Sequence, residues 1–182
     1  MVDHSQCFGD LAADVTLEQG LAYGTMYMTS SVGLRDITDG TSNTMLFSER
    51  AYGAYKEGDQ GDSVDMWWNS GYWGHSHFDT TGPPNTYRKY SGVIAAGAWW
   101  LEDETASSYH PGGVNAAFVD GSVRFIKDTI SSWAIDPNTG SPVGQTYTGS
   151  KMDVAQFGTS KPGVWQALST RNVGEVMSAD SY

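Results

Sequence analysis

Cysteine, basic residues and long apolar runs are all scarce in this sequence. The single cysteine, Cys7, excludes an internal disulfide. There are 10 Lys and Arg against 21 Asp and Glu, so the formal net charge is −11. Nucleic acids and anionic membranes attract proteins through Lys and Arg, and we therefore predict neither as a partner. No apolar run approaches the roughly 18 residues of a bilayer-spanning helix. We predict no membrane span in this chain, and its N-terminus lacks the pattern of a signal peptide.

Glycine and aromatic residues are abundant instead. The 182 residues include 22 Gly, 10 Tyr and 7 Trp, whereas charged residues make up 17%. This composition is typical of loop-rich β structure. We predict an α+β fold dominated by an antiparallel β-sheet with few short helices, in which an N-terminal segment, 1–20, precedes a single domain, 21–182. We expect a strand at Thr44–Glu49 and a C-terminal helix with Val164 and Leu168 on one side.

The segment SSYHPGGVNAAFVDGSVRFIKDTI has the clearest pattern in the chain. Asp120-Gly121 stands between two alternating runs, which predicts a β-hairpin with a two-residue type I′ turn. We expect its strands at Val114–Val119 and Ser122–Lys127. At about 3.3 Å per strand residue, His110 lies about 30 Å from Asp120, so the spacing indicates a fold element and not a catalytic pair. His110 is expected to fix the start of the hairpin by hydrogen bonds, with a ligand role as the alternative.

The two-residue turn also predicts which residues of the hairpin face each other. Pairing outward from the turn places Phe118 opposite Val123 and Ala116 opposite Phe125. These four residues then share one face, which we expect to be the buried face. The other face is mixed in polarity, as in an antiparallel sheet that is covered on one side.

Three segments together resemble a known family. LRDITDGTSNTMLFSE, HPGGVNAAFVDGSVRFI and GVWQALSTRNVGEVMSADSY are similar, in this order, to the prepilin-like proteins of planctomycetes, whose domain carries a His–nine residues–Asp-Gly motif. The resemblance runs from about Leu21 to Tyr182. It implies a pseudopilin-like head in which an antiparallel sheet packs on a long N-terminal helix. This sequence opens with MVDHSQCFGD instead, so we expect a head that lacks its helix.

The same resemblance implies a location and a class of partner. Pseudopilin-like heads belong to type II secretion or surface-filament systems, so the chain is expected at the cell surface, in the periplasm or outside the cell. Other pilin-like subunits or secretion-system proteins would be its partners. The family's apparent relatives include a major pseudopilin whose head is stabilised by calcium, which makes calcium the candidate cofactor.

One loop could supply the ligands for that ion. Within fourteen positions it offers the hard oxygen ligands that calcium prefers, from Asp36, Asp39, Ser42, Asn43 and Glu49. Asp, Asn and Ser are also ordinary turn residues that hydrogen-bond their own backbone. The spacing is not that of an EF-hand, so a structural turn is the alternative.

Two further groups could bind ligands. His75 and His77 lie on one face if their segment is extended and could chelate a transition metal, with Asp65, Asp79 or Glu104 as a further ligand. The alternative is a solvated loop. A dense aromatic group could fill the core or, if exposed, form a stacking surface for glycans or a protein partner; it consists of Trp67, Trp68, Tyr72 and Trp73.

Catalytic patterns are weaker. Glu102, Asp103 and Glu104 are adjacent, so in an extended chain they alternate sides and make a poor glycosidase pair. No G-x-S-x-G motif is present.

Two hypotheses for the function follow from these observations. The first is a structural or assembly protein with a pseudopilin-like head. The second is a metal-dependent hydrolase or a glycan-acting or glycan-binding module, based on the histidine pair, the carboxylates and the aromatic group.

Overall fold

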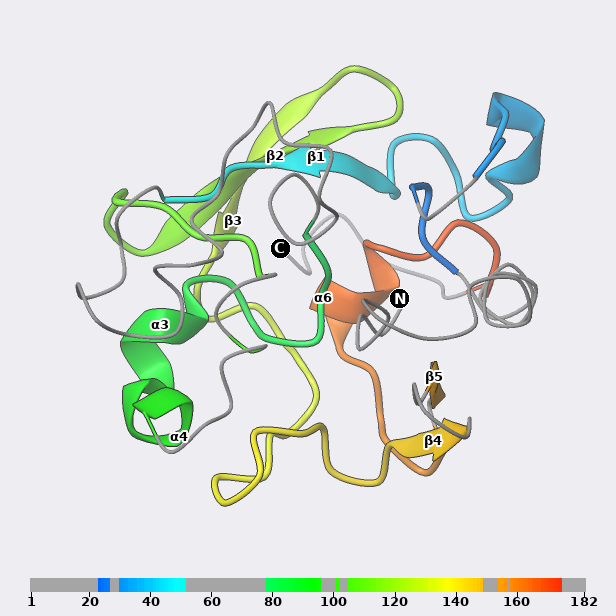
Figure 1. Ribbon diagram of the computed structural model, residues 1–182. Helices are drawn as coiled ribbons and strands as arrows, with labels where there is room; N and C mark the ends of the chain where they lie inside the picture. Colours follow the sequence, from blue (N-terminus) through cyan, green and yellow to red (C-terminus); the bar gives the residue numbers. More distant parts are fainter. Residues whose placement is uncertain are drawn as a thin grey trace.

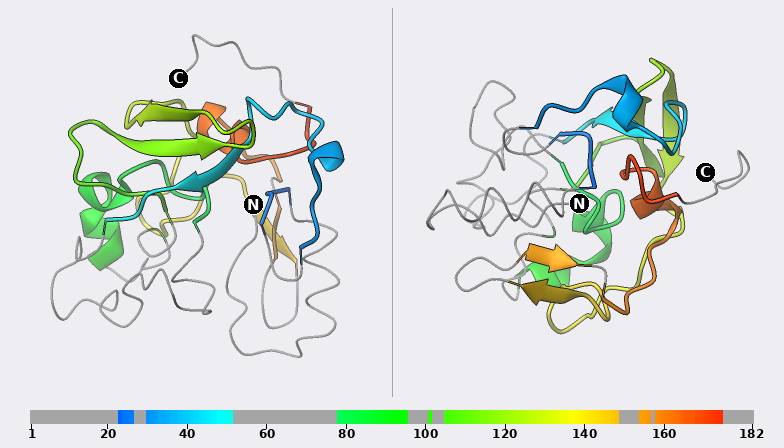
Figure 2. Two further views of the ribbon diagram at one scale, coloured as in Figure 1. Left: turned by 90° about the horizontal axis from the view of Figure 1, so that it is seen from above. Right: turned by 90° about the vertical axis from the view of Figure 1, so that its right-hand side faces the viewer.

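The computed structural model describes residues 23–26, 30–51, 78–95, 101, 105–148, 154–156 and 158–174. These residues form a three-stranded antiparallel sheet in the order β1-β2-β3, a separate two-stranded sheet of β4 and β5, and short helices (Figures 1 and 2). The predicted α+β, loop-rich fold is confirmed. The elements are η1 (Leu34–Asp36), β1 (Met45–Ser48), α3 (Thr86–Lys89), α4 (Ser91–Ala95), β2 (Gly113–Phe118), β3 (Val123–Lys127), β4 (Thr146–Thr148), β5 (Val154–Gln156) and α6 (Val164–Ala167).

The hairpin of β2 and β3 forms where the sequence predicts it, but with a longer turn. Ala117 pairs with Val123 and Ala116 with Arg124, one residue away from the predicted register. The amide of Gly121 donates to Phe118 O at 2.9 Å, and Gly121 has φ +85°. Asp120 does not have the positive φ that a type I′ turn requires at both central positions. The loop therefore has three residues and ends on a left-handed glycine.

This shift reverses the faces of β3. A shift of one residue moves every side chain of a strand to the opposite face. Val123 and Phe125 were predicted to be buried, yet they are 67% and 45% exposed. Ile126 is buried instead, on the face that also holds Ala116 and Phe118. The predicted burial was therefore right for β2 and wrong for β3.

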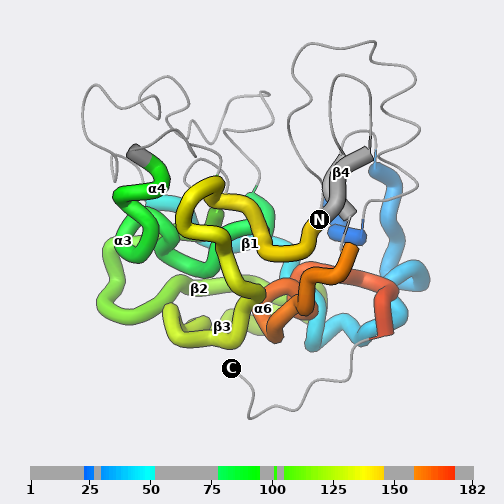
Figure 3. The backbone as a smooth tube through the Cα atoms, turned by 90° about the horizontal axis from the view of Figure 1, so that it is seen from below, coloured from blue at the N-terminus to red at the C-terminus, as the bar shows by residue number. Residues whose placement is uncertain are grey.

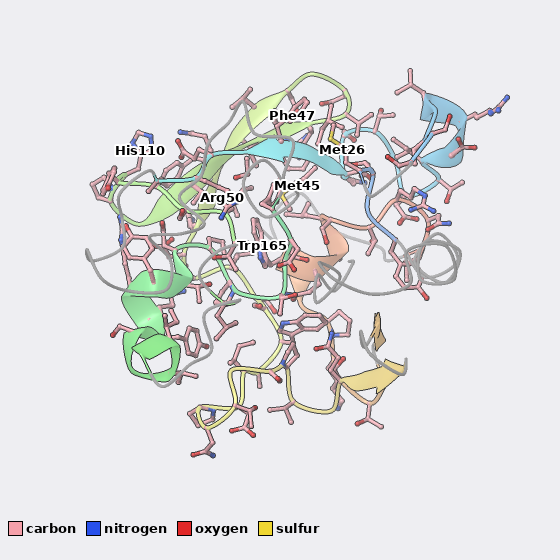
Figure 4. The ribbon with its side chains drawn as sticks, in the orientation of Figure 1. Met26, Met45, Phe47, Arg50, His110 and Trp165 are labelled. Atoms are coloured by element: carbon pink, nitrogen blue, oxygen red, sulfur yellow. The ribbon has the colours of Figure 1, made fainter. Side chains whose placement is uncertain are left out.

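A bulge in β1 completes the sheet. Met45 pairs with Phe118 and Phe47 with Ala117, and the register shifts between them. Without the bulge, residues two apart would point to the same face. With it, Met45 is buried and Phe47 is 56% exposed. Figure 4 shows the two side chains on opposite sides of the strand.

The inner face of the sheet packs on α6 (Figure 3). Trp165 is fully buried there, and its indole N–H donates to Gly82 O at 2.8 Å. Helix α6 matches the predicted C-terminal helix, with Leu168 buried and Val164 packed against the same core. The core cluster consists of Met45, Ala106, Val114, Ala116, Phe118, Ile126, Ile130, Trp165 and Leu168.

A fully buried glutamine holds α6 to the neighbouring loops. Gln166 Oε1 accepts from the amides of Gly163 and Trp133 at 3.0 and 3.2 Å. Its Nε2 donates to Thr80 O at 2.7 Å and to Ser132 Oγ at 3.0 Å. Both ends of the amide are therefore satisfied, as a buried polar group requires.

Among the described residues, no helix is both long and apolar enough to cross a bilayer.

Candidate functional site

The outward-facing side of the three-stranded sheet carries an apolar surface. Phe47, Ala117 and Val123 form one row across the strands, and Phe125 lies two residues from Val123 on the same side. We call these four residues the outer face. Its three large side chains are among the exposed large hydrophobic residues of the chain. Side chains of this kind, gathered on one regular surface, are typical of protein contact sites.

The outer face ends at a polar cluster. His110 Nε2 lies 3.3 Å from Glu49 Oε2, and the His110 ring meets the Phe125 ring edge-on at 6.5 Å between centroids. Glu49 Oε1 also accepts from the backbone amide of Asn115 at 2.6 Å and from its side-chain amide at 3.2 Å. The carboxylate thus ties the end of β1 to β2 and to the turn before it.

A buried network below the surface holds the His110 turn in place. Asn85 is fully buried in a left-handed conformation, with φ 54° and ψ 42°. Its Oδ1 accepts from the amide of Ser108 at 2.7 Å, and its Nδ2 donates to Gly113 O at 3.2 Å and to Asp128 Oδ1 at 2.7 Å. Arg88 adds hydrogen bonds from its guanidinium to the backbone oxygens of Ser108 and His110. A strained backbone conformation persists where its surroundings satisfy it this fully.

Asp120 and Gly121 lie at the other end of β2, at the tip of the hairpin. The amide of Asp120 donates to Thr41 O at 3.0 Å, which ties the tip to the segment before β1. The nearby side chain and backbone of Ser122 hold the pKa of the Asp120 carboxyl below its usual value, and the Ser122 amide donates to Asp120 Oδ1 at 2.9 Å. The structure therefore places His110 and Asp120 at opposite ends of the hairpin, as predicted.

Three of the candidate calcium residues before β1, Asp36, Asp39 and Asn43, have protein partners. Asp36 accepts from the amide of Gly33 at 2.8 Å within its own 3-10 turn. Asp39 accepts from the amides of Val173 and Gly174, both at 2.9 Å, across 134 and 135 residues. The Asp39 carboxylate thus anchors the C-terminal segment of the described chain.

The rest of the proposed ligand set divides between two places. Asn43 donates from Nδ2 to Asp39 O at 3.2 Å, and Ser42 lies in the same turn. Glu49 follows β1 instead and contacts His110. The structure groups four of the five residues before β1 and separates Glu49 from them. Within the described ranges, no three His, Cys, Asp or Glu residues form a group suited to a metal ion. Calcium binding by this loop stays a prediction.

Comparison with known protein families gives one match. The chain matches the family described as "protein of unknown function (DUF1559)" over residues 8–132. It belongs to this family. The comparisons with curated proteins and with solved structures gave no match.

The DUF1559 match contains the outer face and the His110 turn, and it ends before α6. It begins inside the segment 1–20 and stops short of the C-terminal segment that also entered the prepilin-like resemblance.

Several candidate residues lie outside the described part of the chain: Trp67, Trp68, Tyr72, Trp73, His75, His77, Glu102, Asp103 and Glu104. The metal-dependent and glycan hypotheses, which depend on those residues, stay hypotheses.

Sequence reasoning missed the outer face because it assigned Val123 and Phe125 to the core. The segment VRFI has apolar residues at both even and odd positions, so its alternation fits either face. It also missed Asn85, for which the sequence signal is Pro83-Pro84 directly before a residue type that tolerates a left-handed conformation.

Proposed function

We propose that this DUF1559 chain is a structural or assembly protein, a pseudopilin-like head that binds other pilin-like subunits or secretion-system proteins at the cell surface or in the periplasm. The observation that carries the proposal is the outer face. Phe47, Val123 and Phe125 are large, apolar and exposed on one side of a regular sheet. A sheet face that only met water would favour polar residues in alternation with the core positions.

The energy available at this surface supports the proposal. Full burial of a Val or Phe side chain stabilises by roughly 1.5–3 kcal/mol relative to exposure. Phe47, Val123 and Phe125 are 45–67% exposed, so together they can contribute about 2–5 kcal/mol to a contact. Association costs about 4–15 kcal/mol in lost translational and rotational freedom, so the outer face would supply part of the energy of a subunit contact and further contacts would supply the rest.

The roles of the motif residues also favour assembly over catalysis. His110 contacts Glu49 and Phe125, while Asp120 and Gly121 form the tip of the hairpin. Each of these contacts positions β2 and β3, the strands that carry most of the outer face. The His–nine residues–Asp-Gly pattern thus builds the surface that we propose to be functional.

A photocrosslinking experiment tests the proposal. A photoreactive phenylalanine analogue is placed at position 47 in cells that make the protein from its own gene, and crosslinked products are identified by mass spectrometry. We expect pilin-like subunits or secretion-system proteins among them. The control position is Val143, which is 55% exposed and lies in a segment far from the sheet (yellow in Figure 1). Crosslinks that are equal from both positions, or absent from position 47 in folded protein, would contradict the proposal.

A further inference from the structure

Strand β3 forms one edge of the three-stranded sheet. Two hydrogen bonds at its ends show which residues of β3 point their backbone groups toward β2. The amide of Phe118 donates to Ser122 O, and the amide of Asp128 donates to Gly112 O. Because antiparallel pairs alternate between bonded and non-bonded positions, Arg124 and Ile126 also face β2. The backbone N–H and C=O groups of Val123, Phe125 and Lys127 therefore point to the outer edge.

The side chains of these three edge residues are also exposed. Val123 and Phe125 belong to the outer face, and Lys127 is exposed on the same side of the strand. One strand thus presents a row of backbone donors and acceptors together with an apolar surface beside it. This combination selects an extended strand as the occupant, because a strand can bond that row while its side chains pack beside Val123 and Phe125 as cross-strand neighbours.

We propose that the occupant is β3 of a second copy of this chain, paired antiparallel about a two-fold axis at Phe125. The two sheets would then form one continuous six-stranded sheet. The inference rests on the proposed assembly role, because it names the partner for part of the outer face.

The register about Phe125 is self-complementary. It is the one antiparallel register that pairs all five residues of β3 with five of its partner. Phe125 meets the partner's Phe125, and Val123 lies opposite the partner's Lys127. On the inner side, Arg124 lies opposite the partner's Ile126. No like charges face each other, whereas an axis at Arg124 or at Lys127 would oppose two cations.

The distribution of charge also favours this region for a contact between copies. The whole chain carries −11, so two copies repel each other at long range. Strand β3 itself carries Arg124 and Lys127 and no acidic residue. A contact through β3 therefore brings together two segments that do not carry the acidic excess of the chain. Added salt should strengthen the dimer, because it screens the remaining repulsion.

Sedimentation equilibrium of paired charge variants tests the two-fold axis. We expect the native chain to form a concentration-dependent dimer that Phe125→Lys and Phe125→Glu each abolish, because like charges then meet across the axis. An equimolar mixture of the two variants should recover a dimer, since Lys and Glu then face each other. Val143→Lys and Val143→Glu, on a distant exposed residue, should leave dimerisation unchanged.

If circular dichroism shows that a Phe125 variant does not fold, a second pair of variants at Val123 tests the same axis. Val123→Glu faces the partner's Lys127 and should keep the dimer, whereas Val123→Lys should weaken it at least tenfold. A native chain that stays monomeric at all accessible concentrations, or variants that do not follow this charge pattern, would overturn the inference. Crosslinks from position 47 to pilin-like subunits in that case would leave the assembly role intact. A recovered dimer without such crosslinks would leave the dimer and remove the assembly role.

Discussion

His110 and Glu49 are 61 positions apart in the sequence, and their side chains meet at 3.3 Å at the end of the outer face. The contact joins the turn before β2 to the end of β1. Glu49 also accepts two hydrogen bonds from Asn115. One carboxylate therefore fixes the position of both strands beside Phe125.

We expect Glu49→Ala to lower the free energy of unfolding by about 1–2 kcal/mol, because the amides of Asn115 lose their acceptor. His110→Ala should cost less, since its contact with Glu49 is partly exposed and exposed contacts of this kind contribute about 0–1 kcal/mol. Urea unfolding of both single variants and the double variant measures the coupling. The control is Asp36→Asn in an exposed turn. Additive effects of the two substitutions would show that the contact does not stabilise the fold.

Gly121 tests the three-residue loop. No atom lies within 4 Å of a Cβ built at this position, so a substitution there costs backbone strain alone. We expect Gly121→Val to destabilise by roughly 1–3 kcal/mol and Gly121→Asn by clearly less, because Asn tolerates the left-handed conformation. Thermal melting of the two variants measures the difference. Equal melting temperatures for Val and Asn would argue against a left-handed residue at this position.

Gln166 tests the buried link between α6 and the loops. Gln166→Met keeps the size of the side chain but removes the hydrogen bonds to the Gly163 amide and Thr80 O. We expect a loss of about 3 kcal/mol or more in urea unfolding, since each buried group without a partner costs about 1–3 kcal/mol. The exposed Lys161→Met serves as the control. A loss below about 1 kcal/mol would indicate that these groups find other partners.

The strands were predictable from local pattern, whereas the faces of β3 were not. Alternation around Asp120-Gly121 located both strands of the hairpin, because strand period and turn chemistry act over a few residues. The register depended on whether the loop has two or three residues, and the apolar residues of VRFI fit both outcomes. Ile126 belongs to the same buried cluster as Trp165 of α6, and this burial settles the register, although α6 lies about forty residues further along the chain.

Among the site residues, the roles that depend on local pattern were also predictable, whereas the roles that depend on distant contacts were not. Sequence reasoning selected His110, Asp120 and Gly121 as structural, and it assigned Glu49 to an ion. The partner of Glu49 is His110, which lies 61 positions further along the chain, and no local spacing in the sequence reveals a contact over that distance. Asp39 is similar, because its acceptor role toward Val173 and Gly174 depends on the segment after α6 lying beside residues 38–45.

Calcium remains testable at the turn before β1. If calcium binds the folded chain alone, it stabilises by roughly 2.7 kcal/mol at about one hundred times its dissociation constant. Melting should then shift upward with millimolar calcium and downward with chelator. Asp39→Ala also removes the acceptor for Val173 and Gly174, so it should lower stability even with chelator. The informative quantity is the calcium-dependent shift, which Asp39→Ala should reduce and Glu49→Ala should not. Identical curves with calcium and with chelator would exclude the ion.

The most direct test of the account measures how accessible the outer face is in the assembled state. Val123→Cys is prepared with Cys7→Ser as background, and its alkylation by a maleimide is timed in dilute purified protein and in intact cells that make the variant. We predict fast reaction in the purified chain, because Val123 is 67% exposed, and at least tenfold slower reaction in cells, where a partner covers it. Val143→Cys should react fast in both. Equal rates for Val123→Cys in the two settings would contradict the claim that the outer face is an assembly surface.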